Sequence, residues 1–237
     1  MAIQNSENKK PAPKPAPKPK GSGACYLKGT LIQSEDALVA IEDLREGDLV
    51  LTLSGKLEPV QWLGHFTVES ELEPGETEHR GFPVRITKDA FAVNQPSRDL
   101  LVSQLHSIFV DGVFVPAIDL VNDVTVKLEP RSESIYYHVE LPSHNVIYAE
   151  GLPSESYLDD NNRHIFITDA GPVSEVTALN PDMPALASDV IWAQKGYATV
   201  IRSGLQLERI RANLLERAKV LASSAVSKQA SKLRKVA

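Results

Sequence analysis

Residues 25–167 form a succession of short β-branched or alternating apolar runs, and this pattern narrows the possible folds more than any other feature. Turn-forming pairs such as Ser54-Gly55 and Asp111-Gly112 separate the runs, as expected for strands joined by hairpins. The segment VDGVFV predicts a two-residue hairpin, because Asp-Gly accepts the positive φ that a type I′ turn requires. No segment of useful length here repeats with the helical period. The sequence therefore predicts an all-β domain.

The segments on either side of this domain have a different composition. Residues 1–24 contain KKPAPKPAPKPKGSG, in which proline fixes φ and removes amide donors, so we expect a disordered leader without a core. Residues 166–237 begin with loop-like sequence, including ALNPDMPALASDV. Within them, residues 203–222 place apolar side chains three and four positions apart, which predicts an amphipathic helix with a basic polar face. We expect three parts: a leader over 1–24, a β-domain over 25–165 and an extension over 166–237.

The charges of the chain are segregated along its length. Residues 1–24 carry a net charge of +4 and residues 202–237 carry +7, so the total of −6 leaves −17 for the middle. A strongly acidic domain is not expected to bind nucleic acid, which is itself a polyanion. We expect the basic helix to pack on its own acidic domain; a partner or a membrane surface is the alternative.

Several classes of protein are excluded by simple counts. A single cysteine excludes an internal disulfide framework, and we expect neither a metal site nor a cofactor. The sequence contains no run of 18 or more apolar residues, so we expect no membrane span. The N-terminus lacks the apolar region of a secretory signal. We therefore expect the cytoplasm, or export by a route without a recognisable signal.

The single thiol, Cys25, lies where the leader meets the patterned sequence. A cysteine nucleophile needs an acid or base nearby and donors for the developing oxyanion. His106, in LLVSQLHSIFV, follows Ser103 by three residues, and a bend would turn both side chains into one pocket. Taken singly, a buried cysteine or histidine more often packs in a core than reacts.

Three motifs that occur in a fixed order favour a reactive role for Cys25 and His106 over simple core packing. CYLKGTLI continues into VAIEDLREGDLVLT, then comes RDLLVSQLHSIFVDG, and then YYHVELPSHNVIYAEGL. Together they resemble the Hedgehog/intein (Hint) autoprocessing family, and more narrowly the bacterial Hint domains that are not obvious inteins. The resemblance covers residues 25–165, and its specific elements are the leading Cys, the Gly-Thr four residues on, and the Ser-x-x-His block.

This resemblance implies a compact, pseudo-symmetric, horseshoe-like β-domain and an intramolecular acyl shift. The Cys25 sulfur would attack the carbonyl carbon of Ala24, converting the Ala24–Cys25 amide into a thioester. His106 would protonate the departing amide nitrogen, and Ser103 would position or polarise the scissile unit. Water, a thiol or an amine would then attack the thioester and release the N-terminal segment, which is thus the substrate of its own chain.

The sequence departs from the family pattern at several positions. Splicing inteins end with His-Asn, but Glu155-Ser156 falls there, so we expect no splicing. His144 belongs to an earlier His-Asn block, and the acidic position of that block is His138 here. His65 falls near the place of the Asp that activates a sterol in Hedgehog proteins, and we expect no sterol transfer.

Other functions remain open on sequence alone. One is a catalytically silent Hint-like binding or structural module. Another is a cysteine hydrolase acting in trans, with Cys25 and His106 oriented by Asp48 or Asp119. A third is a proline-rich scaffold whose important part is the leader, for instance as a ligand of a proline-recognition module.

Overall fold

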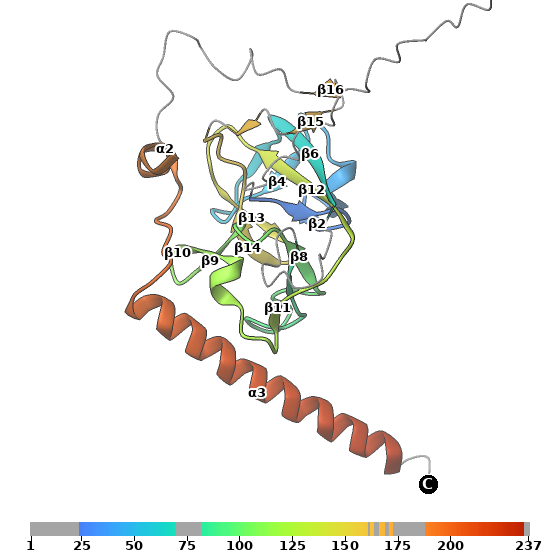
Figure 1. Ribbon diagram of the computed structural model, residues 1–237. Helices are drawn as coiled ribbons and strands as arrows, with labels where there is room; N and C mark the ends of the chain where they lie inside the picture. The colour runs from blue at the N-terminus through green and yellow to red at the C-terminus, as the bar shows by residue number, and fades with distance from the viewer. Residues whose placement is uncertain are drawn as a thin grey trace, which may run out of the picture.

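The computed structural model describes residues 24–69, 82–160, 162–163, 166–168, 171–172 and 188–234. In Figure 1 a body of strands fills the centre and one long helix runs beneath it. Within the described residues, helical structure before residue 188 is limited to the two short 3-10 turns, η1 (Ile41–Asp43) and η2 (Ala117–Leu120), and to isolated turns. The predicted all-β domain is therefore confirmed.

The larger sheet has eight antiparallel strands. The nucleophile candidate directly precedes β1, which pairs with β8 on one side and β12 on the other. The strand order is β11-β7-β8-β1-β12-β6-β15-β16. Its strands, in chain order, are β1 (Tyr26–Leu27), β6 (Trp62–Glu69), β7 (Val84–Ile86), β8 (Leu100–Val102), β11 (Val126–Leu128), β12 (Glu133–Glu140), β15 (Ile167–Thr168) and β16 (Gly171–Pro172).

A six-stranded sheet and a two-stranded ribbon complete the β-domain. The six strands follow the order β10-β9-β14-β13-β2-β3, and the ribbon pairs β4 with β5. These strands are β2 (Leu31–Gln33), β3 (Leu38–Ala40), β4 (Leu49–Leu51), β5 (Leu57–Pro59), β9 (Ser107–Val110), β10 (Val113–Pro116), β13 (Val146–Ala149) and β14 (Leu152–Glu155).

The β9–β10 hairpin is the tight turn that its sequence predicts. Val110 pairs with Val113, so two residues form the loop. Both have positive φ, 51° at Asp111 and 81° at Gly112, as a type I′ turn requires.

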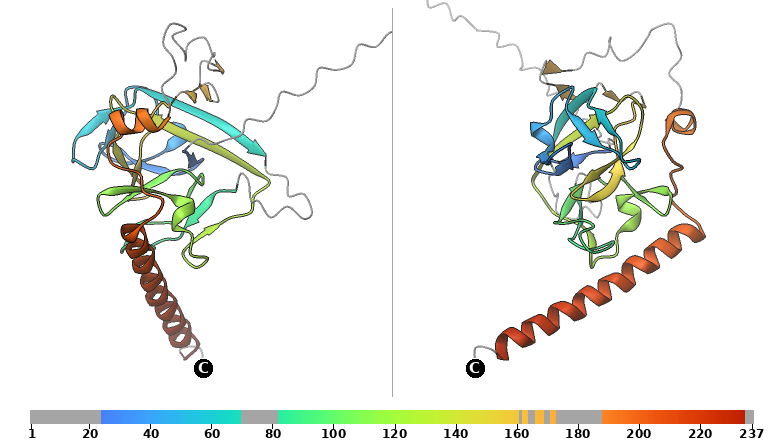
Figure 2. Two further views of the ribbon diagram at one scale, coloured as in Figure 1. Left: turned by 60° about the vertical axis from the view of Figure 1, so that its left-hand side comes forward. Right: turned by 180° about the vertical axis from the view of Figure 1, so that it is seen from behind.

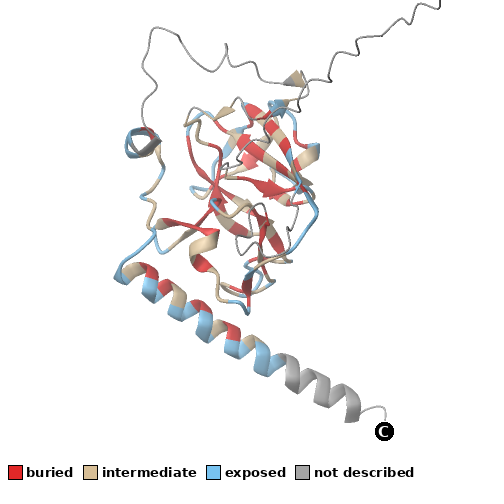
Figure 3. Ribbon diagram, in the orientation of Figure 1, coloured by how far each residue is buried: buried red, intermediate tan, exposed pale blue. Residues whose placement is uncertain are grey.

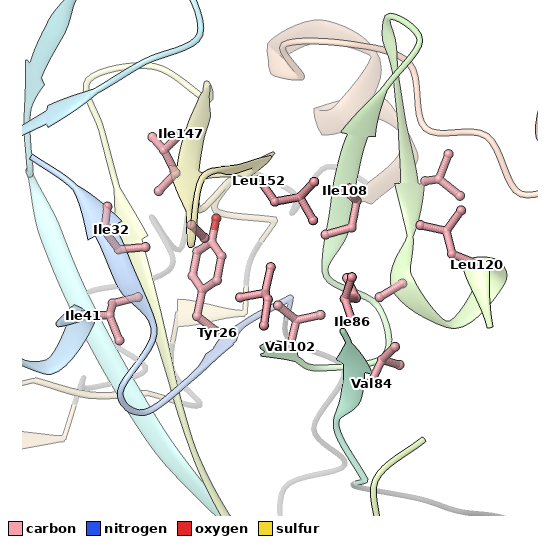
Figure 4. Packing of buried hydrophobic residues seen from close by; sticks show 14 of the residues in the cluster. Tyr26, Ile32, Ile41, Val84, Ile86, Val102, Ile108, Leu120, Ile147 and Leu152 are labelled. Carbon is pink, nitrogen blue, oxygen red and sulfur yellow. The ribbon is translucent and has the colours of Figure 1, made fainter. Parts of the chain in front are cut away.

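The main core lies between the sheets. Figure 4 shows Tyr26 pointing from β1 into a cluster that includes Ile32, Val102 and Ile147. These four side chains have no solvent exposure. Because Tyr26 follows Cys25 directly, the residue next to the nucleophile candidate is fixed by the close packing of the main core.

Two helices follow the β-domain, and here the sequence-based prediction needs correction. α2 (Ser188–Lys195) occupies the end of a stretch that was expected to be loop-like. α3 (Leu205–Arg234) begins close to the predicted start but continues well past residue 222. The added turns contain Ala, Gln, Lys and Arg with no Gly or Pro, and such residues favour helix. None of the described helices is both long and apolar enough to cross a bilayer.

The extension packs on the β-domain. Figures 2 and 3 show α3 alongside the lower end of the strands, with its buried residues turned toward them. The buried stripe is Leu207, Ile210, Leu214 and Ala218, and the first three belong to the main core. Arg202 also bonds to Asp119 at 2.8 Å. The predicted docking of the basic helix on its own acidic domain agrees with these contacts.

Candidate active site

Ser103 holds the backbone of Cys25 from both sides. The Cys25 N–H donates to Ser103 Oγ at 2.8 Å, and the Cys25 carbonyl accepts from the Ser103 N–H at 2.8 Å. The first of these groups is the amide nitrogen of the Ala24–Cys25 bond. The arrangement arises because β1 lies beside β8, and Ser103 comes directly after β8. The peptide plane of the candidate scissile bond therefore has a fixed orientation.

A turn brings His106 to the same place. The His106 N–H donates to the Ser103 carbonyl at 3.1 Å, so the chain reverses over these residues instead of continuing as a strand. The His106 ring lies 4.1 Å from the Tyr26 ring, centroid to centroid. This is the bend that the Ser-x-x-His spacing requires if both side chains are to serve one pocket.

Burial keeps both reactive groups uncharged. Cys25 and His106 have no solvent exposure. Burial raises the pKa of the Cys25 thiol well above its usual range, and the negative charge of Glu155 raises it further. Burial likewise lowers the pKa of His106 to about 3, with a smaller contribution from His144. At neutral pH the resting site contains a thiol and a neutral imidazole, neither a thiolate nor an imidazolium.

Glu155, which the sequence reasoning did not select, lies inside this site. Its Oε1 is 3.9 Å from His106 Nδ1 and accepts a hydrogen bond of 2.6 Å from the Ser107 N–H. Its backbone carbonyl accepts from the Tyr26 hydroxyl at 2.8 Å. Burial raises the carboxyl pKa to about 8, although the hydrogen bonds from Ser107 oppose this shift. The available signal was a lone carboxylate in the run GLPSESY, at the end of a buried strand.

His138 also lies at the site. It is buried on β12, with its ring 5.6 Å from the His106 ring and 6.2 Å from the Tyr26 ring. Its Nδ1 has no hydrogen-bond partner among the described residues. Burial lowers its pKa well below the usual value, and the nearby His106 adds to that shift. The His138 side chain is therefore neutral and packs beside His106 and Tyr26.

His144 contacts a different part of the chain. Its ring stacks on Phe114 at 5.4 Å and meets Trp192 edge-on at 4.9 Å. Its Nδ1 accepts a hydrogen bond of 3.1 Å from the Tyr197 N–H. Among its described contacts, His144 thus joins the β-domain to the C-terminal extension, whereas Cys25, Ser103, His106 and His138 come together around Tyr26.

A cavity of about 1030 Å³ opens beside the candidate scissile bond. Ala24, Glu155 and His138 line one part of it, and Trp192, Tyr197 and Thr199 of the extension line another. The extension is held there by two backbone bonds of 2.9 Å, from the Phe114 N–H to the Thr199 carbonyl and from the Ile201 N–H to the Phe114 carbonyl. The cavity is therefore lined by residues of the β-domain and of the C-terminal extension.

The remaining candidate residues lie elsewhere. Asp48 accepts from the Arg45 N–H at 2.8 Å, and Asp119 forms an ion pair with Arg202. Neither carboxylate is hydrogen-bonded to His106 in the described structure, so an orienting role in a trans-acting hydrolase gains no support. His65 stacks on Tyr137 at 5.2 Å between β6 and β12 and does not line the cavity. Across the described ranges, no cluster of three His, Cys, Asp or Glu side chains is arranged to hold a metal ion.

Comparison with models of known protein families identifies the kind of domain. A family model described as "Hint domain" matches residues 24–161. A comparison with curated proteins gave no match. Among solved structures, a bacterial intein-like domain from Clostridium thermocellum has 16% identity and a TM-score of 0.42, covering 57% of this chain and 100% of its own.

Two inteins give similar figures. The gp41-1 intein has 15% identity and a TM-score of 0.40, covering 56% of this chain and 98% of its own. A DnaB intein from Synechocystis has 10% identity and a TM-score of 0.40, covering 57% of this chain and 100% of its own.

Proposed function

Because the chain belongs to the Hint domain family, whose members are self-processing domains, we propose that it cuts its own Ala24–Cys25 bond through a thioester. The observation that supports this most directly is the pair of hydrogen bonds between Ser103 and Cys25, at the start of the turn that carries His106.

The first step is an N-to-S acyl shift. The Cys25 sulfur attacks the carbonyl carbon of Ala24, the carbon–nitrogen bond breaks, and the thiol proton is in balance transferred to the Cys25 nitrogen. The reacting atoms belong to adjacent residues, and such intramolecular placement is worth up to about 7–11 kcal/mol of barrier. Ser103 holds the scissile N–H, and His106 delivers the proton that makes the nitrogen a leaving group.

The second step uses the cavity beside Ala24. Water, a thiol or an amine enters there and attacks the thioester carbon, the carbon–sulfur bond breaks, and the sulfur regains its proton. One product is the segment 1–24, whose Ala24 carbonyl is now bonded to the nucleophile. The other is a domain that begins with Cys25. The chain has Glu155-Ser156 where splicing inteins have His-Asn, so no second cut accompanies this one.

The test is the intact mass of freshly purified protein. We expect dithiothreitol or hydroxylamine to release residues 1–24, and N-terminal sequencing of the large fragment to begin at Cys25. Cys25→Ala should leave the chain whole under the same conditions, because the thioester cannot form. A first residue other than Cys25 would contradict the mechanism. A wild-type chain that stays whole and inert would instead favour a silent Hint-like binding module.

A further inference from the structure

Burial of His106 creates a difficulty for the proposed acyl shift. The imidazole is neutral, so it has a single N–H to donate. If Nε2 gives that proton to the Cys25 nitrogen while Nδ1 receives none, an imidazolate forms in a site with no solvent exposure. An uncompensated buried anion is costly. A neutral histidine can serve as an acid here only if a second group supplies a proton to its other nitrogen.

Glu155 is placed to be that group. Its Oε1 lies 3.9 Å from His106 Nδ1, and a movement of about 1 Å brings the two within hydrogen-bond reach. The residue is held at both ends, by the Ser107 N–H at the carboxyl and by the Tyr26 hydroxyl at the backbone carbonyl. Neither nitrogen of His106 has another hydrogen-bond partner among the described residues.

We propose that Glu155 is the proton relay of His106 in the acyl shift, an inference that rests on the proposed function. The Glu155 carboxyl gives its proton to Nδ1 of His106 while the Nε2 proton passes to the Cys25 nitrogen. The proton released by the attacking Cys25 thiol restores the carboxyl, and His106 ends as the other neutral tautomer. No charge remains in the buried site, and one proton has moved from sulfur to nitrogen.

The charged groups around Glu155 fit this role. His106 and His138 are held neutral by burial, and Cys25 is held as a thiol. Burial raises the pKa of Glu155 to about 8, and the charge of Asp160 contributes in the same direction. The carboxyl is therefore mostly protonated at pH 7 and loses its proton above pH 8. Deprotonation removes the relay and also raises the pKa of the Cys25 thiol, so both effects slow the shift as pH rises.

The test is the rate of thioester formation between pH 6 and 10, measured at dithiothreitol concentrations above which the rate no longer increases. We expect the wild-type rate to fall above about pH 8. Glu155→Gln keeps the shape and an acceptor for the Ser107 N–H, yet cannot relay a proton. It should slow the shift by about 10²-fold at pH 7, at the lower end of the range of general acid–base catalysis, and abolish the fall above pH 8.

Two controls separate this relay from a structural role. Glu58→Gln alters a partly buried carboxyl that bonds to Asn145 outside the site, and it should leave the pH profile unchanged. If Glu155→Gln lowers the melting temperature strongly, Glu155→Asp should slow the shift while retaining the fall at high pH. A Glu155→Gln enzyme with the wild-type rate and pH profile would overturn the inference alone. A wild-type chain that forms no thioester would overturn the proposed function itself.

Discussion

At the scale of single residues, the candidate scissile bond lies directly before β1, a strand of the larger sheet. Cys25 precedes β1 directly; its carbonyl accepts from the Ser103 N–H, and its own N–H donates to the Ser103 side chain. His106 reaches the site through the turn that begins at Ser103. The three residues to which we assign roles are thus positioned through one strand pairing, so small backbone shifts would affect all of them together.

The first prediction concerns the two residues of this turn. His106→Ala should slow thioester formation by about 10²–10⁴-fold, because it removes the acid that protonates the leaving nitrogen. Ser103→Ala should slow it less, since it removes only the acceptor that orients the scissile N–H. Quench-flow or manual sampling with hydroxylamine measures both rates.

A matched serine elsewhere provides the control for Ser103. Ser34 Oγ donates to the Leu49 carbonyl at 2.6 Å, also a side chain-to-backbone bond, but outside the site. Ser34→Ala and Ser103→Ala should each cost about 1 kcal/mol of stability, and only Ser103→Ala should alter the cleavage rate. Equal cleavage rates for the two variants would show that Ser103 has a structural role only.

The site residues illustrate what a sequence can and cannot predict. Cys25, Ser103 and His106 lie in motifs of fixed spacing, so the sequence suggests them together. In the structure Ser103 bonds to the Cys25 backbone and the His106 N–H bonds to the Ser103 carbonyl, while their catalytic roles stay predictions. Glu155 was missed because its importance depends on burial beside a histidine 49 positions away in the chain. His144 also comes from a motif; its ring contacts Phe114 and Trp192, and its charge would lower the pKa of His106, so its catalytic role stays a prediction. Local motifs indicate which residue types could react, whereas contacts between residues far apart in the chain become visible only in the tertiary structure.

At the scale of elements, local turn chemistry and side-chain period were the reliable guides. The Asp111-Gly112 hairpin followed directly from residues that accept positive φ. The strand order could not be predicted, because β1 pairs with β8 and β12, both more than 70 residues away along the chain. The period of three and four also predicted the α3 stripe, although the helix continues to Arg234.

The contribution of the buried α3 stripe to stability can be measured by comparing two adjacent leucines. Leu214 is 3% exposed and belongs to the main core, while its neighbour Leu215 is 42% exposed on the same helix. Leu214→Ala should lower the free energy of unfolding by about 2–5 kcal/mol, because it leaves a cavity in packed apolar surroundings. Leu215→Ala should change it by no more than about 0.5 kcal/mol. Urea denaturation followed by fluorescence measures both values, and equal losses would contradict the packing described.

At the scale of the whole molecule, the extension completes the β-domain. Its helix contributes Leu207, Ile210 and Leu214 to the core that also contains Tyr26. Its preceding segment forms part of the wall of the cavity beside Ala24. Opposite charges accompany this contact, as in the ion pairs of Arg202 with Asp119 and of Arg209 with Asp111. Such exposed pairs add little free energy, so apolar packing carries the association.

The shared core has a consequence for the time at which the cut can occur. Synthesis runs from the N-terminus, so Ala24 and Cys25 leave the ribosome well before Leu207 and Leu214 of α3, which follow more than 180 residues later. The core around Tyr26, next to Cys25, is therefore completed only after α3 has been synthesised. We expect ribosome-bound chains that expose α3 outside the exit tunnel to release residues 1–24 with hydroxylamine, and chains that expose residues only up to about 187 to resist. Release from the shorter chains would show that the β-domain matures alone. If only the longer chains respond, cleavage after Ala24 depends on the prior synthesis of α3.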